Sequence, residues 1–77
     1  MKDLIEYLAR ALVDEPDRVS VDSYEEEDGT VVYELHVSED DVGKVIGRGG
    51  RTVNALRAVV RAAAVREGRR VLVDVVD

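Results

Sequence analysis

The 77-residue sequence contains no cysteine, tryptophan or phenylalanine, and only one histidine and one proline. The lack of cysteine excludes disulfide bonds, a thiol nucleophile and cysteine–zinc sites, and a single histidine excludes a histidine-rich metal site. No apolar run approaches the roughly 20 residues of a membrane span, and the first residues lack a signal-peptide pattern. Nothing indicates an activated nucleophile, so we expect a cytoplasmic protein that is neither an enzyme nor dependent on a cofactor.

The apolar residues that are present, 45% of the chain, suffice for one small globular domain over residues 1–77. The net charge of −6 argues by itself against a nucleic-acid partner. The charges are unevenly distributed, however: residues 1–43 carry 3 Lys/Arg and 14 Asp/Glu, whereas residues 44–70 carry 8 Lys/Arg and only Glu67. Because a phosphate responds to the local field of one face, the basic block remains compatible with nucleic-acid binding.

Hydrophobic periodicity predicts a helix followed by a hairpin. Apolar residues at helical spacing predict the helix, with Asp3 as its cap, Glu6 completing a box-like N-terminus and an end before Pro16. These apolar residues are Leu4, Leu8, Ala11 and Leu12, with Ile5 beside them. Alternating residues over 18–24 and 31–37 then predict two paired strands. His36 falls on the wetter face of the second strand, so it is interpreted as a surface residue.

The second half predicts two helices and a final strand. A short helix over about residues 39–46, with a capping pattern at Ser38 and Asp41, ends at Gly47. After the long helix described next, alternating valines predict a strand over residues 71–76, compatible with burial on both faces because Leu72 and Val76 are apolar too. The predicted order is therefore α-β-β-α-α-β.

The long helix, Arg51 to Glu67, is followed by Gly68 as a natural C′ residue. One apolar stripe suits the cover of a sheet and consists of Val53, Leu56, Val59, Val60 and Ala63. Small residues cluster roughly opposite: Ala55, Ala58, Ala62 and Val65. This second face either permits close approach of a partner helix or reflects only the helix propensity of alanine. We prefer dimerisation because so small a core benefits from a partner.

The basic block contains a glycine-rich stretch that looks suited to a phosphodiester backbone. It reads Val45-Ile46-Gly47-Arg48-Gly49-Gly50-Arg51-Thr52-Val53. Glycine permits close backbone approach, and the start of the following helix favours an anion. Cationic and apolar neighbours complete the predicted nucleic-acid site: Lys44, Val45, Ile46, Gly47, Arg48, Gly49, Gly50, Arg51 and Arg57. Val42 and Val53 would add to the apolar side of the groove, although Ile46 and Val53 suit the core equally well.

Three phosphate-binding motifs compete for this stretch. A Walker A loop is disfavoured because Val45 stands at the position of its first glycine and arginine replaces its lysine. A dinucleotide fingerprint is disfavoured because Thr52 replaces the last glycine and a helix precedes the loop. The G-x-x-G loop between two helices, which clamps about four nucleotides of single-stranded RNA or DNA, is satisfied by Gly47 to Gly50.

At these residues the chain resembles a KH domain, whose V-I-G-x-x-G-x-x-I core is matched from Val45 to Val53 with valine in the last position. The element order is similar to the type II arrangement, and nearly the whole chain resembles the small single-KH bacterial RNA-binding proteins of the KhpA type. Leu12 to Pro16 and Gly50 to Arg57 also look like that group.

The resemblance implies an α+β fold, with a three-stranded mixed sheet and helices on one face. It implies non-catalytic binding of single-stranded RNA, as a global RNA chaperone or post-transcriptional regulator linked to cell-envelope growth and division. It also implies a homodimer, or a heterodimer with a larger KH protein of the Jag type. Because the three tyrosines lie outside the loop, we expect little base stacking and modest sequence selectivity. The alternative is a dimerisation module with a structural glycine loop.

Overall fold

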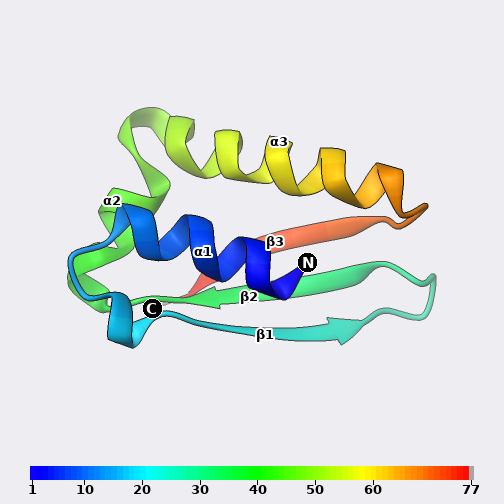
Figure 1. Cartoon of the computed structure of the whole chain (residues 1–77), viewed down its shortest axis with the longest axis horizontal. Helices are drawn as coiled ribbons and strands as arrows, with labels where there is room; N and C mark the ends of the chain where they lie inside the picture. The colour runs from blue at the N-terminus through cyan, green and yellow to red at the C-terminus, as the bar shows by residue number, and fades with distance from the viewer. Residues whose placement is uncertain (77) are drawn as a thin grey trace.

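A computed structural model describes residues 1–76 and has the predicted α+β architecture. In chain order the elements are α1 (Lys2–Leu12), η1 (Pro16–Arg18), β1 (Ser20–Glu25), β2 (Val31–His36), η2 (Glu39–Asp41), α2 (Val42–Ile46), η3 (Arg48–Gly50), α3 (Arg51–Arg66) and β3 (Val71–Val76). The strands form one sheet in the order β1-β2-β3, with β1 antiparallel and β3 parallel to β2 (Figure 1). The three-stranded mixed sheet expected from the sequence is confirmed.

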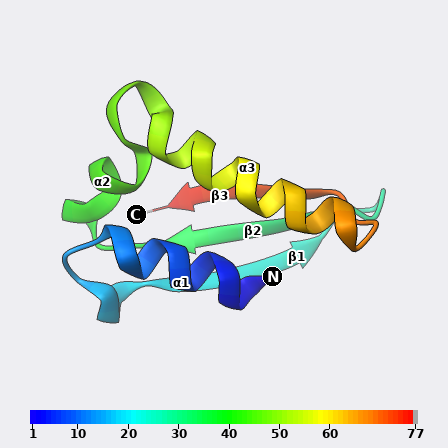
Figure 2. The same ribbon diagram turned by 45° about the horizontal axis from the view of Figure 1, so that its top comes forward.

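The connections explain how the layers are arranged. A tight turn joins β1 to β2, with Gly29 at φ +89° and the Thr30 N–H donating to Asp28 Oδ1 at 2.9 Å. Parallel strands require a crossover, and α2 and α3 supply it between β2 and β3. Helices α1 and α3 lie side by side on one face of the sheet, while the corner between α2 and α3 projects at one end (Figures 1 and 2). Within residues 1–76, the opposite face of the sheet carries no helix.

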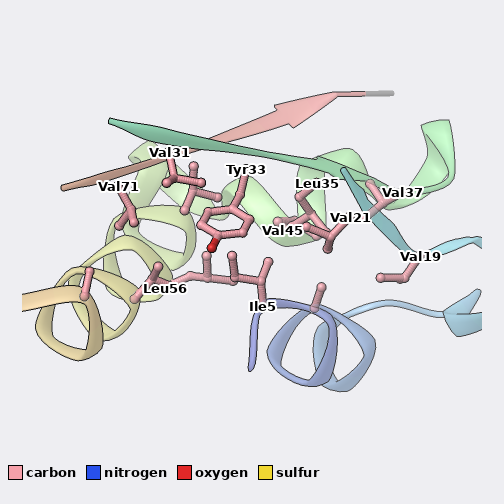
Figure 3. Close-up of a cluster of buried hydrophobic side chains, with 14 residues drawn as sticks. Ile5, Val19, Val21, Val31, Tyr33, Leu35, Val37, Val45, Leu56 and Val71 are labelled. Atoms are coloured by element: carbon pink, nitrogen blue, oxygen red, sulfur yellow. The ribbon is translucent and has the colours of Figure 1, made fainter. Parts of the chain in front are cut away.

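The core lies between the sheet and its helices (Figure 3). Ile5 and Ala9 from α1 and Val60 from α3 are fully buried against Leu35 of the central strand and Val45 of α2. Val31, Tyr33 and Leu35 alternate toward this core, as the hairpin pattern predicted. Fourteen buried residues of the described part of the chain form this cluster.

The first helix differs from its prediction in two details. It begins at Lys2, one residue before the predicted cap Asp3, and has no side-chain capping hydrogen bond. The stripe that is buried is Ile5 and Ala9, whereas Ala11 and Leu12 are exposed. The spacing indicated a helix correctly, but the angle at which α1 sits on the sheet selects which apolar residues are covered.

The predicted burial of the long helix α3 and of the last strand β3 is also corrected by the structure. On α3 the buried residues are Val53, Leu56, Val60 and Ala64, while Val59 is 49% exposed. In β3 only alternate residues are buried, and Leu72 is 50% exposed on the open face of the sheet. Burial on both faces is therefore wrong for β3, because the sheet has one layer of helices and β3 is an edge strand.

The end of α3 agrees with the prediction. Gly68 has φ +69°, its N–H donates to Val65 O, and the Arg69 N–H donates to Ala64 O. These two bonds form a Schellman motif, which satisfies carbonyls left open at the helix end. The stop after Arg66 directs the chain back along the sheet as β3. Among residues 1–76, no helix is both long enough and apolar enough to cross a membrane.

Candidate nucleic-acid interface

The glycine loop consists of residues 47–50 and turns the chain from α2 into α3. Gly47 has φ +76° and ψ 171°, a conformation that is essentially restricted to glycine. Gly49 and Gly50 follow in left-handed conformations, with φ of +63° and +80°. The Gly50 N–H donates to Gly47 O at 3.1 Å, which closes the turn. Three glycines are thus required by backbone conformation, and only Arg48 in the loop carries a side chain.

Gly47 is also constrained by packing. A Cβ atom at this position would lie 2.7 Å from Thr52 Cβ and 2.8 Å from Thr52 N, closer than real contacts allow. By contrast, a Cβ at Gly49 would meet no atom within 4 Å, so the backbone there is open to solvent. The first glycine therefore seats the loop against α3, while Gly49 leaves room for a ligand to approach the main chain.

The outer side of the loop offers hydrogen-bond donors and positive charge. The backbone N–H groups of Arg48 and Gly49 form no hydrogen bond with other groups in residues 1–76. The side chains of Arg48 and Arg51 are exposed and form no ion pair within the same range. Arg51 opens α3, whose first-turn N–H groups add to the positive potential. This combination suits a phosphate group.

Lys44 is held in a different set of contacts from the two arginines. Its Nζ lies 2.6 Å from Asp14 Oδ2 and 3.4 Å from Asp41 Oδ1. The hydrogen bond to Asp14 and the charges of both carboxylates raise the pKa of the Lys44 ammonium, against a smaller opposing effect of desolvation. The predicted role of Lys44 as a direct phosphate contact therefore competes with a salt bridge that fastens α2 to the segment after α1.

Asp41 is the buried centre of that contact and is only 1% exposed. Its two carboxylate oxygens accept hydrogen bonds from the backbone N–H groups of Asp14 at 3.2 Å and Glu15 at 3.0 Å. Burial raises the pKa of this carboxyl, but the two N–H donors and Lys44 outweigh burial, so the pKa lies below its ordinary value. The predicted helix start is confirmed, since Ser38 and Asp41 hold the N-cap positions of η2 and α2, but neither side chain makes a capping hydrogen bond. The Asp41 carboxylate instead binds the backbone of Asp14 and Glu15, 27 and 26 residues earlier in the chain.

The apolar residues predicted for the groove divide into two groups. Val45 is 0% exposed and Val53 is 4% exposed, so both side chains belong to the interior. Direct contact with RNA by the Val45 side chain does not fit this burial. Val42 and Ile46 are partly exposed beside the loop and remain available as groove wall. The amphipathic face of the short α2 decides the division, because it turns only one of its apolar sides to the sheet.

Arg57 lies six residues beyond Arg51 on α3, and its side chain reaches the edge strand. Its Nε donates to Val73 O at 3.0 Å. The two residues border a cavity of about 270 Å³ between α3 and β3, which is lined by Arg57, Arg61, Val71, Leu72, Val73 and Asp74. The predicted continuation of the positive track at Arg57 therefore coincides with a real depression in the surface.

The backbone of β3 also borders this depression. The sequence did not predict this contribution. Val31 N–H donates to Arg70 O and Val37 N–H donates to Val76 O, so these two carbonyls face β2. Because backbone groups alternate along a strand, those of Val71, Val73 and Val75 face the edge. The crossover through two helices could have indicated this exposed backbone edge, since a last strand joined in parallel to the second strand of a hairpin lies at one edge of a three-stranded sheet.

No group of side chains in residues 1–76 has the composition of a metal site. The described features are a glycine loop between two helices, a positively charged helix start and a groove beside an edge strand. They lie on a three-stranded mixed sheet whose elements follow the order α-β-β-α-α-β. This arrangement defines a KH domain of the type II order. The chain belongs to the KhpA/KhpB family, because the KhpA/KhpB KH-domain model matches residues 2–75.

Relatives of similar length agree with this assignment. The chain is 54% identical to a protein of Halalkalibacterium halodurans, with all of both chains covered. It is 45% identical to one of Clostridium perfringens, covering 99% of this chain and all of the relative. It is also 52% identical to one of Mycobacterium tuberculosis, covering 97% of this chain and 89% of the relative. Each of the three is named RNA-binding protein KhpA. No solved structure matched the chain.

Proposed function

We propose that this chain is a non-catalytic RNA-binding protein that holds short single-stranded segments through the loop of residues 47–50. The loop carries the proposal: Gly47, Gly49 and Gly50 all have positive φ angles, and the two arginines beside them, Arg48 and Arg51, are exposed. Backbone N–H groups and guanidinium groups are the donors that phosphates accept from most readily. The printed names of the relatives support the same ligand.

The groove between α3 and β3 extends this proposed site beyond the loop. Phosphates would lie against Gly47 to Arg51, while bases would lie over Ile46 and toward Arg57 at the edge of the sheet. A G-x-x-G loop clamps about four nucleotides of a single strand, so we expect single strands to be preferred over duplex RNA. No tryptophan or phenylalanine is available for stacking, and so the electrostatic part of the binding should be prominent.

Salt dependence tests the proposal. A loop that clamps about four nucleotides should give a plot of log K against log salt with a slope no steeper than about −3, at roughly −0.7 per phosphate. Fluorescence anisotropy with a labelled single-stranded RNA 12-mer and the same RNA in a duplex would measure it. We expect affinity in the micromolar range or weaker and a preference for the single strand. Equal affinity for the duplex, or no salt dependence, contradicts the proposal.

A second candidate function is assembly through the exposed side of the helical layer. Ala55, Ala58 and Ala62 are exposed on α3, and Val65 is 70% exposed. Next to them, an apolar cavity of about 250 Å³ lies between α1 and α3, lined by Leu8, Ala11, Leu12, Thr52, Ala55, Leu56 and Val59. Such a surface suits a self-complementary contact, so we propose a homodimer. The family resemblance adds a heterodimer with a larger KH protein of the Jag type as the alternative.

The two candidates are compatible, because the assembly surface and the loop lie at different parts of α3. A dimer would carry two loops and gain avidity if both could engage one strand. On the family resemblance we extend the proposal to a cytoplasmic role as an RNA chaperone or post-transcriptional regulator in cell-envelope growth and division. Sequencing of RNA crosslinked to the protein in its source cell tests that extension, which is wrong if transcripts of envelope genes are not enriched.

A further inference from the structure

The face of the sheet turned away from α1 and α3, which we call the outer face, has an ordered pattern of side chains (Figures 1 and 2). Side chains alternate along each strand, and Val31, Tyr33 and Leu35 of β2 point into the core. The residues between them point outward and line up with their register partners in rows across the three strands. One row is Tyr24, Val32 and Leu72, and the next is Asp22, Glu34 and Asp74. None of the outward positions in the strands is a lysine or an arginine.

The first row is apolar and lies outside the main core. Val32 is only 2% exposed, yet it does not belong to the cluster between the sheet and the helices. Its two register partners, Tyr24 and Leu72, flank it from the neighbouring strands and are each about half exposed. A solvated sheet face normally carries polar residues at its outward positions. This row therefore forms an apolar strip that a partner could cover.

The second row is acidic and is unfavourable to the fold. Glu34 lies directly opposite Asp22 on one neighbouring strand and Asp74 on the other. Like charges that face each other across strands destabilise a sheet, and aspartate is a poor strand former. His36 Nε2 lies 3.2 Å from Asp22 Oδ2. Within residues 1–76, Glu34 and Asp74 form no ion pair and no side-chain hydrogen bond. Their carboxylates are thus free to meet a cation.

The chemistry of the outer face selects one class of partner. A row of carboxylates repels the phosphates of RNA, so this face does not extend the site at the glycine loop. A second copy placed against the same face would bring the carboxylates onto each other or onto the apolar strip, and both contacts are unfavourable. A basic protein segment with an apolar residue satisfies both rows, because its cations meet the carboxylates while its apolar side chain covers the strip.

We propose that the outer face of the sheet is a docking surface for a protein segment that is rich in lysine and arginine and carries a leucine or a similar apolar anchor. The anchor lies over Val32, between Tyr24 and Leu72, and the cations face Glu34 and Asp74. Because neighbouring strands are about 4.8 Å apart, the acidic row spans roughly 10 Å, so a short segment can cover it. This docking is independent of the proposed RNA binding, since the glycine loop joins two helices of the other layer.

NMR shift mapping tests the proposal, with the full chain labelled with nitrogen-15 and the synthetic peptide acetyl-KLKRLKR-amide as the probe. The backbone amides of Tyr24, Val32 and Leu72 should shift on titration. The peptide acetyl-KGKRGKR-amide, which lacks the anchor, should bind at least about threefold more weakly, and acetyl-ELEELEE-amide should not bind. Shifts confined to other parts of the chain, or equal binding of the acidic peptide, would overturn the proposal. Concentration-dependent shifts of the same three amides without peptide would identify a second copy as the occupant and would overturn it too.

Two matched double variants assign the peptide to the acidic row. Glu34→Gln/Asp74→Asn removes two charges from the row and should weaken binding of the basic peptide at least about fivefold. Asp17→Asn/Asp40→Asn removes two charges from exposed residues outside the strands and should change it less than about twofold. The thermal midpoint of Glu34→Gln/Asp74→Asn should not fall, because repulsion between facing carboxylates is removed. Equal peptide affinity in the two double variants, or a loss of RNA affinity in Glu34→Gln/Asp74→Asn, would overturn the proposal.

A second pair of variants tests the apolar strip. Leu72→Thr should weaken binding of the leucine peptide at least about threefold and leave binding of the glycine peptide unchanged, because only the leucine peptide has an anchor to lose. Val65→Thr, which changes an exposed apolar residue on α3, should affect neither peptide. An unchanged affinity of Leu72→Thr for the leucine peptide would show that the strip is not the docking surface.

Discussion

Thr52 packs directly against the Cα of Gly47, so that a Cβ on residue 47 would lie 2.7 Å from the Thr52 Cβ. The backbone at Gly47 also occupies a region that costs other residues about 1–3 kcal/mol. We therefore expect Gly47→Ala to destabilise the protein by at least about 2 kcal/mol, a fall of roughly 8 °C or more in the thermal midpoint. Calorimetry would measure it.

Gly43→Ala is the control for this prediction. Gly43 lies inside α2 without a positive φ, and a Cβ there would meet no atom within 4 Å. Its replacement should be neutral or stabilising by up to about 1 kcal/mol. Equal stability of Gly47→Ala and Gly43→Ala would contradict the conformation assigned to the loop.

The Asp41 carboxylate should make the free energy of unfolding decrease at acidic pH. Its pKa in the folded protein lies below the ordinary value of 3.8. Its contribution is therefore complete above pH 3.8 and is lost as the pH falls through the folded pKa. In Asp41→Asn, the NH₂ group of the new side chain would face one of the backbone N–H groups of Asp14 and Glu15, which would lose its acceptor. The thermal midpoint should therefore fall by at least about 5 °C at pH 7. The deficit should shrink near pH 2.5.

Thermal denaturation followed by circular dichroism at pH 7 and pH 2.5 would measure the Asp41 effect, with Asp40→Asn as an exposed neighbouring control. Asp40→Asn should have little effect at either pH. A deficit for Asp41→Asn that is the same at both pH values would show that the carboxylate charge does not carry the contact.

Lys44 and Arg48 should respond in opposite ways to loss of charge. The raised pKa of Lys44 means that its ion pairs are complete below the ordinary value of 10.5 and are lost only as the pH rises above it. At pH 7, Lys44→Met should thus lower the thermal midpoint and leave the RNA affinity nearly unchanged. Arg48→Met, at an exposed residue without an ion pair in the described chain, should do the reverse. If Lys44→Met and Arg48→Met lose the same amount of RNA affinity, Lys44 contacts the phosphates as the sequence predicted.

Negative charge on the loop should abolish RNA binding. In Arg48→Asp/Gly49→Asp, two carboxylates would face the phosphates, and nothing within 4 Å obstructs a side chain at residue 49. The control Arg48→Asn/Gly49→Asn has the same shape and the same strain of about 1 kcal/mol at the left-handed residue 49. Anisotropy should show at least tenfold weaker binding for the aspartate pair than for the asparagine pair, at equal thermal midpoints. Matching affinities would mean that the loop is not the clamp.

The exposed face of α3 can be tested by exchange of charge at Ala62. A two-fold axis through this face would bring residue 62 close to its copy. Ala62→Glu and Ala62→Lys should each be monomeric through like-charge repulsion, and an equimolar mixture should restore a dimer. Sedimentation at tens of micromolar would show it. A monomeric unmodified protein would refute the homodimer, and a mixture that stays monomeric would refute this face as its interface.

Local sequence determined the elements and the loop. Glycines at 47, 49, 50 and 68 stand where the backbone takes positive φ values, and the strands and helices follow periods of two and 3.6 residues. These are properties of neighbouring residues, so they can be interpreted without knowledge of distant contacts. The resemblance to KH domains rests on the same local pattern, because the glycine motif and its flanking apolar residues are contiguous from Val45 to Val53.

Tertiary structure alone decided which side chains are free to act. The sequence grouped Lys44 with Arg48, but Lys44 pairs with Asp14, a residue 30 positions earlier. It allowed Leu72 to be buried, but a sheet covered on one face leaves that residue half exposed. It gave no sign that Asp74 lies in one row with Asp22 and Glu34. Pairing and burial depend on how elements far apart in the chain are packed, and periodicity within one element contains no information about that packing.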